Sequence, residues 1–295
     1  MRCRGAVRVA CAAMLSLTPL RRWRRRTALL ALLMAASGCA LRTAAPPTPP
    51  WPDVLQTLLP TDVLLLGEKH DAPQHQQLEQ QAVAWLAERG LLAALVIEMA
   101  EQGHDTRALE PSANETQVQA ALDWNTDAWP WSAYGPVVMA AVRAGVPVLG
   151  GNLPRSALRA TMEQTSLDAL LTPAQRARQE QAVRDGHCGL LPEARIPGMV
   201  RVQVARDVHM ARTMASALRS QQVVVLVAGA WHAQRGLGVP LHLPENIKQK
   251  VVIAHAGQAP TAIKSEANLV QQTPDLPPDD ACVSLRQRWP AAPAR

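Results

Sequence analysis

An apolar run that ends in charged residues decides the fold of this protein: Asp62-Val63-Leu64-Leu65-Leu66-Gly67-Glu68-Lys69-His70-Asp71. Four further runs are apolar, apart from Glu98 near the end of the first of them, and do not alternate with polar residues: Ala94–Met99, Val146–Leu149, Val223–Val227 and Val251–Ala254. Continuous apolar runs of this length are typical of strands covered on both faces, as in a parallel sheet. We therefore predict five buried strands, the first of them over Asp62–Leu66.

Segments with helical periodicity separate these runs, and we predict helices over Gln74–Arg89, Ala133–Ala144, Pro173–Arg184 and Met199–Leu218. The alternation of strands and helices predicts an α/β fold with a mainly parallel sheet flanked by helices. About residues 155–220, between the third and fourth strands, are too many for one crossover, so we expect a helical subdomain inserted there. Residues 258–295 are rich in proline, and we expect a C-terminal tail.

The amino terminus has the pattern of an export signal. Arg21–Arg26 form a basic cluster, and the apolar stretch Thr27–Ala36 is too short to span a bilayer. The small residues Ala36-Ser37-Gly38 before Cys39 resemble a bacterial lipoprotein cleavage site. We therefore predict a signal peptide over 1–38, lipidation of Cys39 and a tether over 39–54. Ala40 after the cysteine indicates the outer membrane of a Gram-negative cell, facing the periplasm; a plain secretory signal is the alternative.

The formal charge of +6 belongs to this signal, because residues 1–38 contain eight arginines and no acidic residue. Without them the formal charge is −2. The mature chain thus has no basic excess, and nucleic acid is not expected as a partner. Besides Cys39, the mature chain keeps only Cys188 and Cys282, and an oxidising periplasm would favour a disulfide between these two.

The pattern Gly-x-x-His occurs twice, each time directly after an expected strand: Gly67–His70 follows the first, and Gly229–His232 follows the fourth. The carboxyl ends of parallel strands form the ligand crevice in open α/β sheets, and glycine lets the chain turn tightly there. Glu98 ends the second strand, where an unused carboxylate is costly. We expect the two histidines and this carboxylate to converge.

Four strand ends together bring polar side chains to one edge: Glu68, His70, Glu98, Asn152, Arg155, His232 and Arg235. A single histidine after a strand more often caps a turn or fills the edge of a core. The same structural alternative holds for His75, at the start of a predicted helix. The coincidence of several ionisable groups on one edge nevertheless favours a binding site.

Further motifs follow in one order along residues 55–257: Leu65–Asp71 with His75, Ile97-Glu98-Met99, Trp131 with Tyr134, Asn152–Arg155, His187-Cys188-Gly189-Leu190, Arg206-Asp207 with Met210, and Ala228–His232 with Gly238-Val239-Pro240. Together with the lipoprotein signal, this set resembles the ChaN-type haem-binding lipoproteins of the Tiki-like superfamily. The resemblance implies a parallel sheet with flanking helices and a small helical domain. It also implies a protein that binds haem and takes part in haem or iron uptake. On this interpretation the protein is a binding protein and not an enzyme.

The resemblance also suggests ligands. In the type member, two haems stack face to face across a dimer, a tyrosine of one subunit ligates each iron, and a histidine of the other meets the haem. Tyr134 is the sequence's one tyrosine, and it is either this ligand or a structural residue. His70, His75 and His232 are the next candidates, and Arg155 and Arg235 are candidates to pair with haem propionates. The resemblance further implies a homodimer on haem binding and an outer-membrane haem receptor as a partner.

Hydrolysis is the competing function. The wider superfamily includes metal-dependent peptidases with the same doubled Gly-x-x-His, and esterase relatives. On this interpretation Glu68, His70, Glu98 and His232 bind a divalent metal such as zinc or manganese, and Glu68 or Glu98 acts as a base on water. The sequence contains no Gly-x-Ser-x-Gly, so we do not expect a serine triad.

Overall fold

The computed structural model of the protein describes residues 49–277 and 281–288. The predicted signal peptide (1–38), Cys39 and the first part of the predicted tether lie outside the described residues. The last part of the predicted tether is helical, because helix α2 begins at Trp51. Among the described residues, no helix combines the length and the apolar character needed to cross a membrane.

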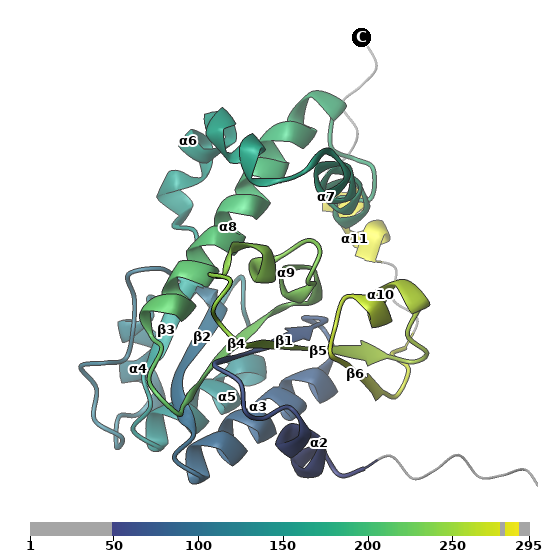
Figure 1. Cartoon of the computed structure of the whole chain (residues 1–295). Coiled ribbons are helices and arrows are strands. Elements are labelled where there is room, and N and C mark those ends of the chain that lie inside the picture. The colour runs from purple at the N-terminus through teal and green to yellow at the C-terminus, as the bar shows by residue number, and fades with distance from the viewer. Residues whose placement is uncertain (1–48, 278–280, 289–295) are drawn as a thin grey trace, which may run out of the picture. The chain divides into compact units, whose positions relative to one another are not determined.

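One parallel sheet forms the centre of the described chain, with the strand order β3-β2-β4-β1-β5-β6 (Figure 1). This confirms the predicted α/β fold class. Its strands are β1 Val63–Glu68, β2 Leu92–Glu101, β3 Val148–Asn152, β4 Val223–Gly229, β5 Gln249–Ala256 and β6 Leu269–Thr273.

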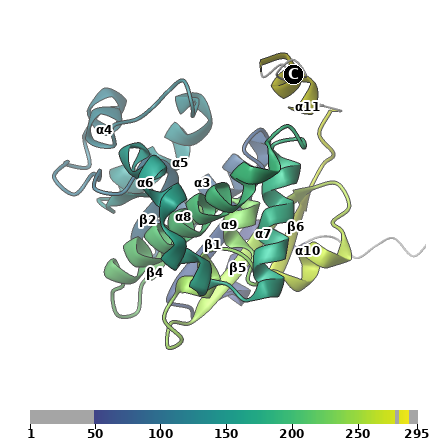
Figure 2. The same ribbon diagram turned by 90° about the horizontal axis from the view of Figure 1, so that it is seen from above.

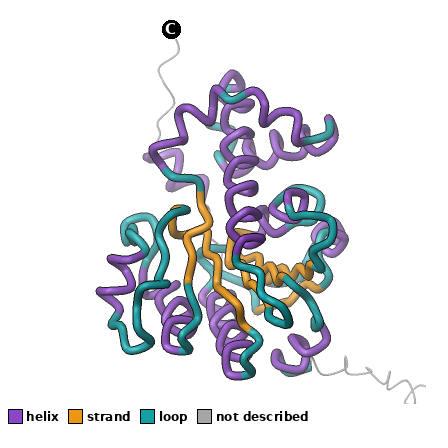
Figure 3. Tube along the Cα trace, turned by 60° about the vertical axis from the view of Figure 1, so that its left-hand side comes forward, coloured by secondary structure: helices purple, strands orange, loops and turns teal. Residues whose placement is uncertain are grey.

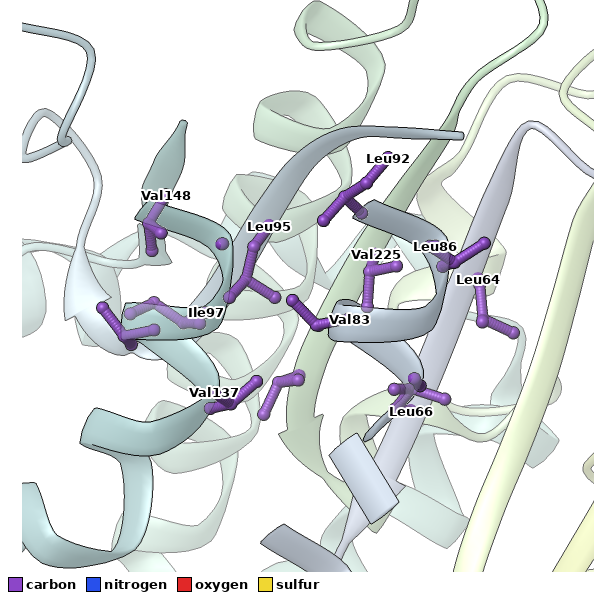
Figure 4. Packing of buried hydrophobic residues seen from close by; sticks show 14 of the residues in the cluster. Leu64, Leu66, Val83, Leu86, Leu92, Leu95, Ile97, Val137, Val148 and Val225 are labelled. Carbon is purple, nitrogen blue, oxygen red and sulfur yellow. The ribbon is translucent and has the colours of Figure 1, made fainter. Parts of the chain in front are cut away.

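Alternate residues of the central strands point to opposite faces of the sheet and pack in two separate cores. This is why the predicted strands are apolar on both faces. On one face Leu64, Ile97 and Val225 belong to a cluster with helices α2 (Trp51–Thr57), α3 (Pro73–Glu88) and α5 (Trp131–Arg143) (Figure 4). On the other face the neighbouring strand residues, such as Leu65 and Leu226, pack with Met210 and Met214 of α8 (Ile196–Ser216).

The predicted helical subdomain lies between β3 and β4 and has a core of its own, built from Leu167, Val183, Ile196 and Val200 among others. Figure 3 shows its helices gathered beyond one end of the strands. Helix α8 joins the two parts, because its first half belongs to the subdomain core and its second half packs on the sheet. The subdomain consists of η1 Arg155–Ala157, α6 Leu158–Glu163, η2 Thr165–Leu170, α7 Pro173–Gly186, η3 Glu193–Arg195 and α8.

The segment expected as a C-terminal tail is partly structured, which corrects that expectation. Strand β6 pairs in parallel with β5 and extends the sheet. Helix α11 (Ala281–Arg288) follows, and Cys282 on it forms a disulfide with Cys188, two residues after the end of α7. The remaining helices are α4 Glu115–Ala121, α9 Ala230–Ala233, η4 Val239–His242 and α10 Thr261–Ser265.

The order of the strands creates a crevice. The chain passes from β1 to β2 and β3 on one side, returns to β4, and continues to β5 and β6 on the other side. Strand β4 therefore lies between β1 and β2, and the direction of the connections reverses there. Ligands of open α/β sheets bind at the carboxyl ends of strands at such a reversal. Figure 2 looks onto this region and shows α7 and α8 in front of the strands.

Candidate functional site

A cavity of about 300 Å³ lies between the carboxyl ends of β1, β2 and β4 and the helices α7 and α8. The first Gly-x-x-His contributes His70, strand β2 contributes Glu98, and the second Gly-x-x-His contributes His232. The three side chains that we expected to converge therefore line one cavity. Its other walls include Trp129, Gln179, Val183, His187, Gln203, Arg206 and Trp231.

Glu68, the last residue of β1, orients His70. Its Oε1 lies 2.8 Å from His70 Nδ1 and accepts a hydrogen bond of 2.6 Å from the Tyr134 hydroxyl, while Gln76 donates to its Oε2. Because a carboxylate only accepts, His70 donates from Nδ1, which leaves Nε2 toward Glu98 and Gly229 in the cavity wall. Burial lowers the pKa of His70, but the bond to Glu68 and the charge of Glu98 outweigh it, so the net shift is upward.

Gly229 leaves the space that this histidine occupies. A Cβ on Gly229 would lie 2.9 Å from His70 Nε2 and 3.6 Å from Oε2 of Glu98. Its backbone N–H donates to the same Glu98 oxygen at 2.8 Å. Gly229, from the second Gly-x-x-His, thus leaves room for His70, from the first. The two motifs lie side by side because β1 and β4 are neighbours and Glu68 pairs with Gly229.

His232 lies between two buried carboxylates. Its Nδ1 is 2.6 Å from Oδ1 of Asp207, and its Nε2 is 3.4 Å from Oε1 of Glu98. Burial lowers its pKa, but the charges of Glu98 and Asp207 outweigh burial and raise it to about 10. Burial raises the pKa of Asp207 to about 6, and His232 limits this rise. At neutral pH the histidine is therefore an imidazolium held by both carboxylates.

The same imidazolium determines the charge of Glu98. Burial alone would raise the pKa of this carboxyl, but the charge of His232, with His70 and the Gly229 N–H, brings it well below the usual value. Glu98 is 3% exposed, so a carboxylate stays ionised inside the wall of the cavity. Asn152, at the end of β3, stabilises the last part of β2, because its side chain donates to the Glu98 main-chain oxygen at 2.8 Å.

Arg206 and Asp207 were not among the predicted site residues, although their motif was part of the family resemblance. Asp207 is three residues after Val204 and four before Ala211, on the apolar face of α8, and it is fully buried. A carboxylate on the apolar face of a helix was the signal available in the sequence. The neighbouring Arg206 lines the cavity, and its buried Nε has no hydrogen-bond partner among the described residues.

Tyr134 lies in the protein interior, not in the wall of this cavity. It is 2% exposed, and its hydroxyl donates to Glu68. Burial and the charge of Glu68 raise its pKa strongly, so the side chain is a neutral phenol at neutral pH. Of the two roles left open for Tyr134, this geometry favours the structural one.

His75 and Arg235 do not line this cavity, so the structure does not bring these two predicted ligand contacts together with His70, Glu98 and His232. His75 is fully buried at the start of α3, where Nδ1 accepts from the Lys69 N–H and Nε2 lies 3.0 Å from the Thr273 hydroxyl. Burial lowers its pKa, so it is a neutral structural residue. Arg235 is not among the lining residues, and Arg155 lines adjoining hollows instead.

The four side chains of the alternative metal site are close together, but they contact one another as donors and acceptors. His70 faces Glu68 through Nδ1, and His232 faces both Glu98 and Asp207. Within the described part of the chain, no three His, Cys, Asp or Glu side chains are grouped so that they could hold a metal ion. The geometry does not support the zinc or manganese site.

Comparison with solved structures places this fold beside the ChaN protein of Campylobacter jejuni, which binds haem cofacially. The TM-score is 0.61 at 22% identity, over 74% of this chain and 89% of that chain. More distant likenesses are the type III effector HopBA1 (TM-score 0.43, 16% identity, 79% and 97% covered) and a mutant of the erythromycin esterase EreC in an open conformation (0.41, 14%, 68% and 72%). These two are too remote to bear on function.

No curated protein matches the chain. A family model described as haem-binding uptake, Tiki superfamily, ChaN matches residues 54–243. This match contains the strands β1 to β4 and the whole helical subdomain, and it therefore includes every residue that lines the cavity. The chain belongs to the ChaN family of haem-binding uptake proteins in the Tiki superfamily.

Proposed function

We propose that this protein binds haem in the cavity between β1, β2, β4 and the helical subdomain, and that it serves haem or iron uptake. The observation that carries the proposal is the orientation of His70. Glu68 accepts a hydrogen bond from Nδ1, and Nε2 is left at the cavity. Histidines that ligate a metal almost always donate their other ring N–H to a carboxylate, a carbonyl or water. His70 is therefore the residue that we favour to hold the iron.

The remaining walls suit the other parts of a haem. Trp129 stands edge-on to His70, with ring centroids 4.8 Å apart, and Trp231 is 52% exposed although it is large and apolar. These rings offer apolar surface to a porphyrin. The unpartnered Nε of Arg206 offers a donor for a propionate carboxylate, which pairs well with a guanidinium. When bound, the iron would supply the Lewis-acid centre that Nε2 ligates.

His232 has a different role in this proposal. Its ring nitrogens lie 2.6 Å from Asp207 and 3.4 Å from Glu98, closer than the 3.9 Å between His70 Nε2 and Glu98, and its pKa of about 10 keeps it protonated at neutral pH. A protonated imidazole has no free lone pair for iron. We therefore assign to His232 the stabilisation of Glu98 and of the cavity wall.

A haemin titration of the full chain, followed by visible absorption, tests the proposal. We expect a saturable spectral change in wild type. His70→Ala should weaken haemin binding by at least roughly 10- to 100-fold, which is the loss that typically follows removal of a residue that only orients a metal ligand. Tyr134→Phe should keep the wild-type spectrum. His104→Ala is the matched histidine control, because His104 does not line the cavity.

Two results would contradict the proposal. A changed spectrum in Tyr134→Phe with an unchanged one in His70→Ala would move the ligand to the tyrosine. Weak adsorption without saturation in wild type would remove haem altogether. The competing hydrolase would then be the next candidate, to be examined with a metal and substrate screen.

The attachment to a membrane is a separate proposal, which rests on the sequence. Lipidation of Cys39 would hold the protein on the outer membrane facing the periplasm, where a haem receptor would deliver its ligand and where two copies would associate on haem. Cys39→Ser should release the protein from the membrane fraction, and mass spectrometry of the wild-type amino terminus should show the acyl groups. A membrane-bound Cys39→Ser variant would contradict the anchor.

A further inference from the structure

A second hollow, of about 900 Å³, lies within the helical subdomain and is strongly basic. Its walls contain four arginines, Arg155, Arg159, Arg195 and Arg201, and one carboxylate, Glu163. The hollow therefore has an excess of positive charge, although the mature chain has a formal charge of −2. Apolar side chains from the same helices, Leu158, Met162, Leu191 and Met199, complete the lining.

Three of these four arginines lack the carboxylate partner that Arg176, Arg184 and Arg201 of the same subdomain have among the described residues. Arg176, Arg184 and Arg201 each form an ion pair with a carboxylate: Asp168, Glu193 and Asp168 respectively. Arg155, Arg159 and Arg195 are exposed, and none forms an ion pair with a described residue. Guanidinium groups gathered around a hollow without carboxylate partners suit an anionic ligand, above all one with carboxylates or phosphates.

His187 connects this hollow with the first cavity, because it lines both. Its Nδ1 lies 2.7 Å from the Val183 carbonyl oxygen and donates to it. With the proton on Nδ1, the lone pair of the ring lies on Nε2, and a hydrogen bond from the other ring nitrogen to a carbonyl is typical of histidines that ligate a metal. The adjacent Cys188 is held by the disulfide to Cys282, so the turn that carries His187 is fixed to helix α11.

We infer that the arginine hollow is a second binding site for an amphiphilic dicarboxylate, haem itself. Arg155, Arg159 and Arg195 would hold its propionates, and His187 would hold its iron. The inference rests on the proposed function. An apolar ring with two carboxylates matches a hollow that combines an apolar lining with three unpaired guanidinium groups. Because His187 borders both cavities, a haem in the hollow lies next to the first site, and the two sites form a path for transfer within one chain.

Haemin stoichiometry of the full chain tests this inference. We expect two equivalents per wild-type chain and one in the double variant Arg159→Glu with Arg195→Glu. The matched control is Arg143→Glu with Arg219→Glu, which makes the same charge change at exposed arginines outside both cavities and should still bind two. His187→Ala should weaken the second equivalent more than the first, because His187 lines both cavities but is a proposed ligand only in the hollow. Circular dichroism melting checks that each variant is folded. If the double variant is not folded, the single variant Arg159→Glu tests the hollow, because Arg159 does not line the first cavity.

Each other outcome has a definite meaning. One equivalent in wild type, lost in His70→Ala and unchanged in the arginine variant, overturns this inference and leaves the proposed function intact. Two equivalents that are both lost in His70→Ala, with the arginine variant unchanged, identify a stacked pair at the first site and also overturn it. No saturable binding overturns both the inference and the proposed function.

Discussion

Nδ1 of His232 lies 2.6 Å from Oδ1 of Asp207, and both side chains are buried in the described structure. The two residues come from different elements, because Asp207 is on the sheet-facing part of α8 and His232 follows β4. Their pairing connects the helical subdomain to the sheet edge. Since Glu98 contacts the other ring nitrogen, the stability of the site and its charge depend on one imidazolium.

The first prediction concerns the pH dependence of stability. The pKa of His232 is raised from 6.5 to about 10, so its contribution is complete below pH 6.5 and is lost as the pH rises through about 10. The free energy of unfolding should fall over this window by at most about 1.4 kcal/mol per pH unit. Urea unfolding at several pH values measures this fall. NMR of labelled histidines should show that His232 is still protonated at pH 8. It should also show that His75 is neutral there, because its pKa is lowered. A neutral His232 at pH 8 would contradict the assignment.

The second prediction separates the two histidines of the Gly-x-x-His motifs by stability. His232→Ala leaves Glu98 and Asp207 buried without their cation, which should cost about 3–5 kcal/mol. His70→Ala should cost about 1 kcal/mol or less, because the side chain is 39% exposed and Glu68 keeps its bonds from Tyr134 and Gln76. Urea unfolding of both variants at pH 7 checks the difference. Equal losses would mean that the carboxylates do not depend on His232.

The third prediction concerns Gly229. In Gly229→Ala the new methyl group would meet His70 Nε2 at 2.9 Å, so the imidazole must turn away from its position at the cavity. We expect a folded protein with haemin affinity weakened about 10- to 100-fold, as for loss of an orienting partner. Gly186→Ala is the control: Gly186 also lines the cavity, but a Cβ there meets nothing within 4 Å. Wild-type haemin affinity in Gly229→Ala would show that His70 does not contact the ligand.

The fourth prediction concerns the disulfide. It joins residues 94 apart in sequence, and cross-links that close long loops typically stabilise by about 2–4 kcal/mol. Cys188→Ser with Cys282→Ser should therefore lower the free energy of unfolding by about this amount, measured against wild type in urea. Non-reduced wild type should take up no thiol alkylator at Cys188 or Cys282. Uptake of two equivalents at these cysteines would show that the bridge is absent in solution.

The sequence by itself determined the fold class and five of the six strands of the described sheet. Runs such as Val223–Val227 are apolar at every position because both faces of the sheet are covered, and this pattern needs no knowledge of distant contacts. Strand β6 was missed for the converse reason. It lies at the edge of the sheet, and its residues Leu269–Thr273 are only partly buried and include Gln271 and Gln272. Its pairing with β5 gives little apolar signal in the sequence.

The sequence also indicated that His70, Glu98 and His232 meet, because they follow strands whose carboxyl ends lie on one edge. Only the tertiary structure decided what each one does. Two histidines with the same local motif differ because Asp207 approaches one of them from α8 while the other faces the cavity. The neighbours that pack against a side chain likewise decide the roles of Tyr134, His75 and Arg235. Local pattern fixes where a side chain leaves the backbone, whereas its protonation and access depend on charges and burial contributed by residues far away in the chain.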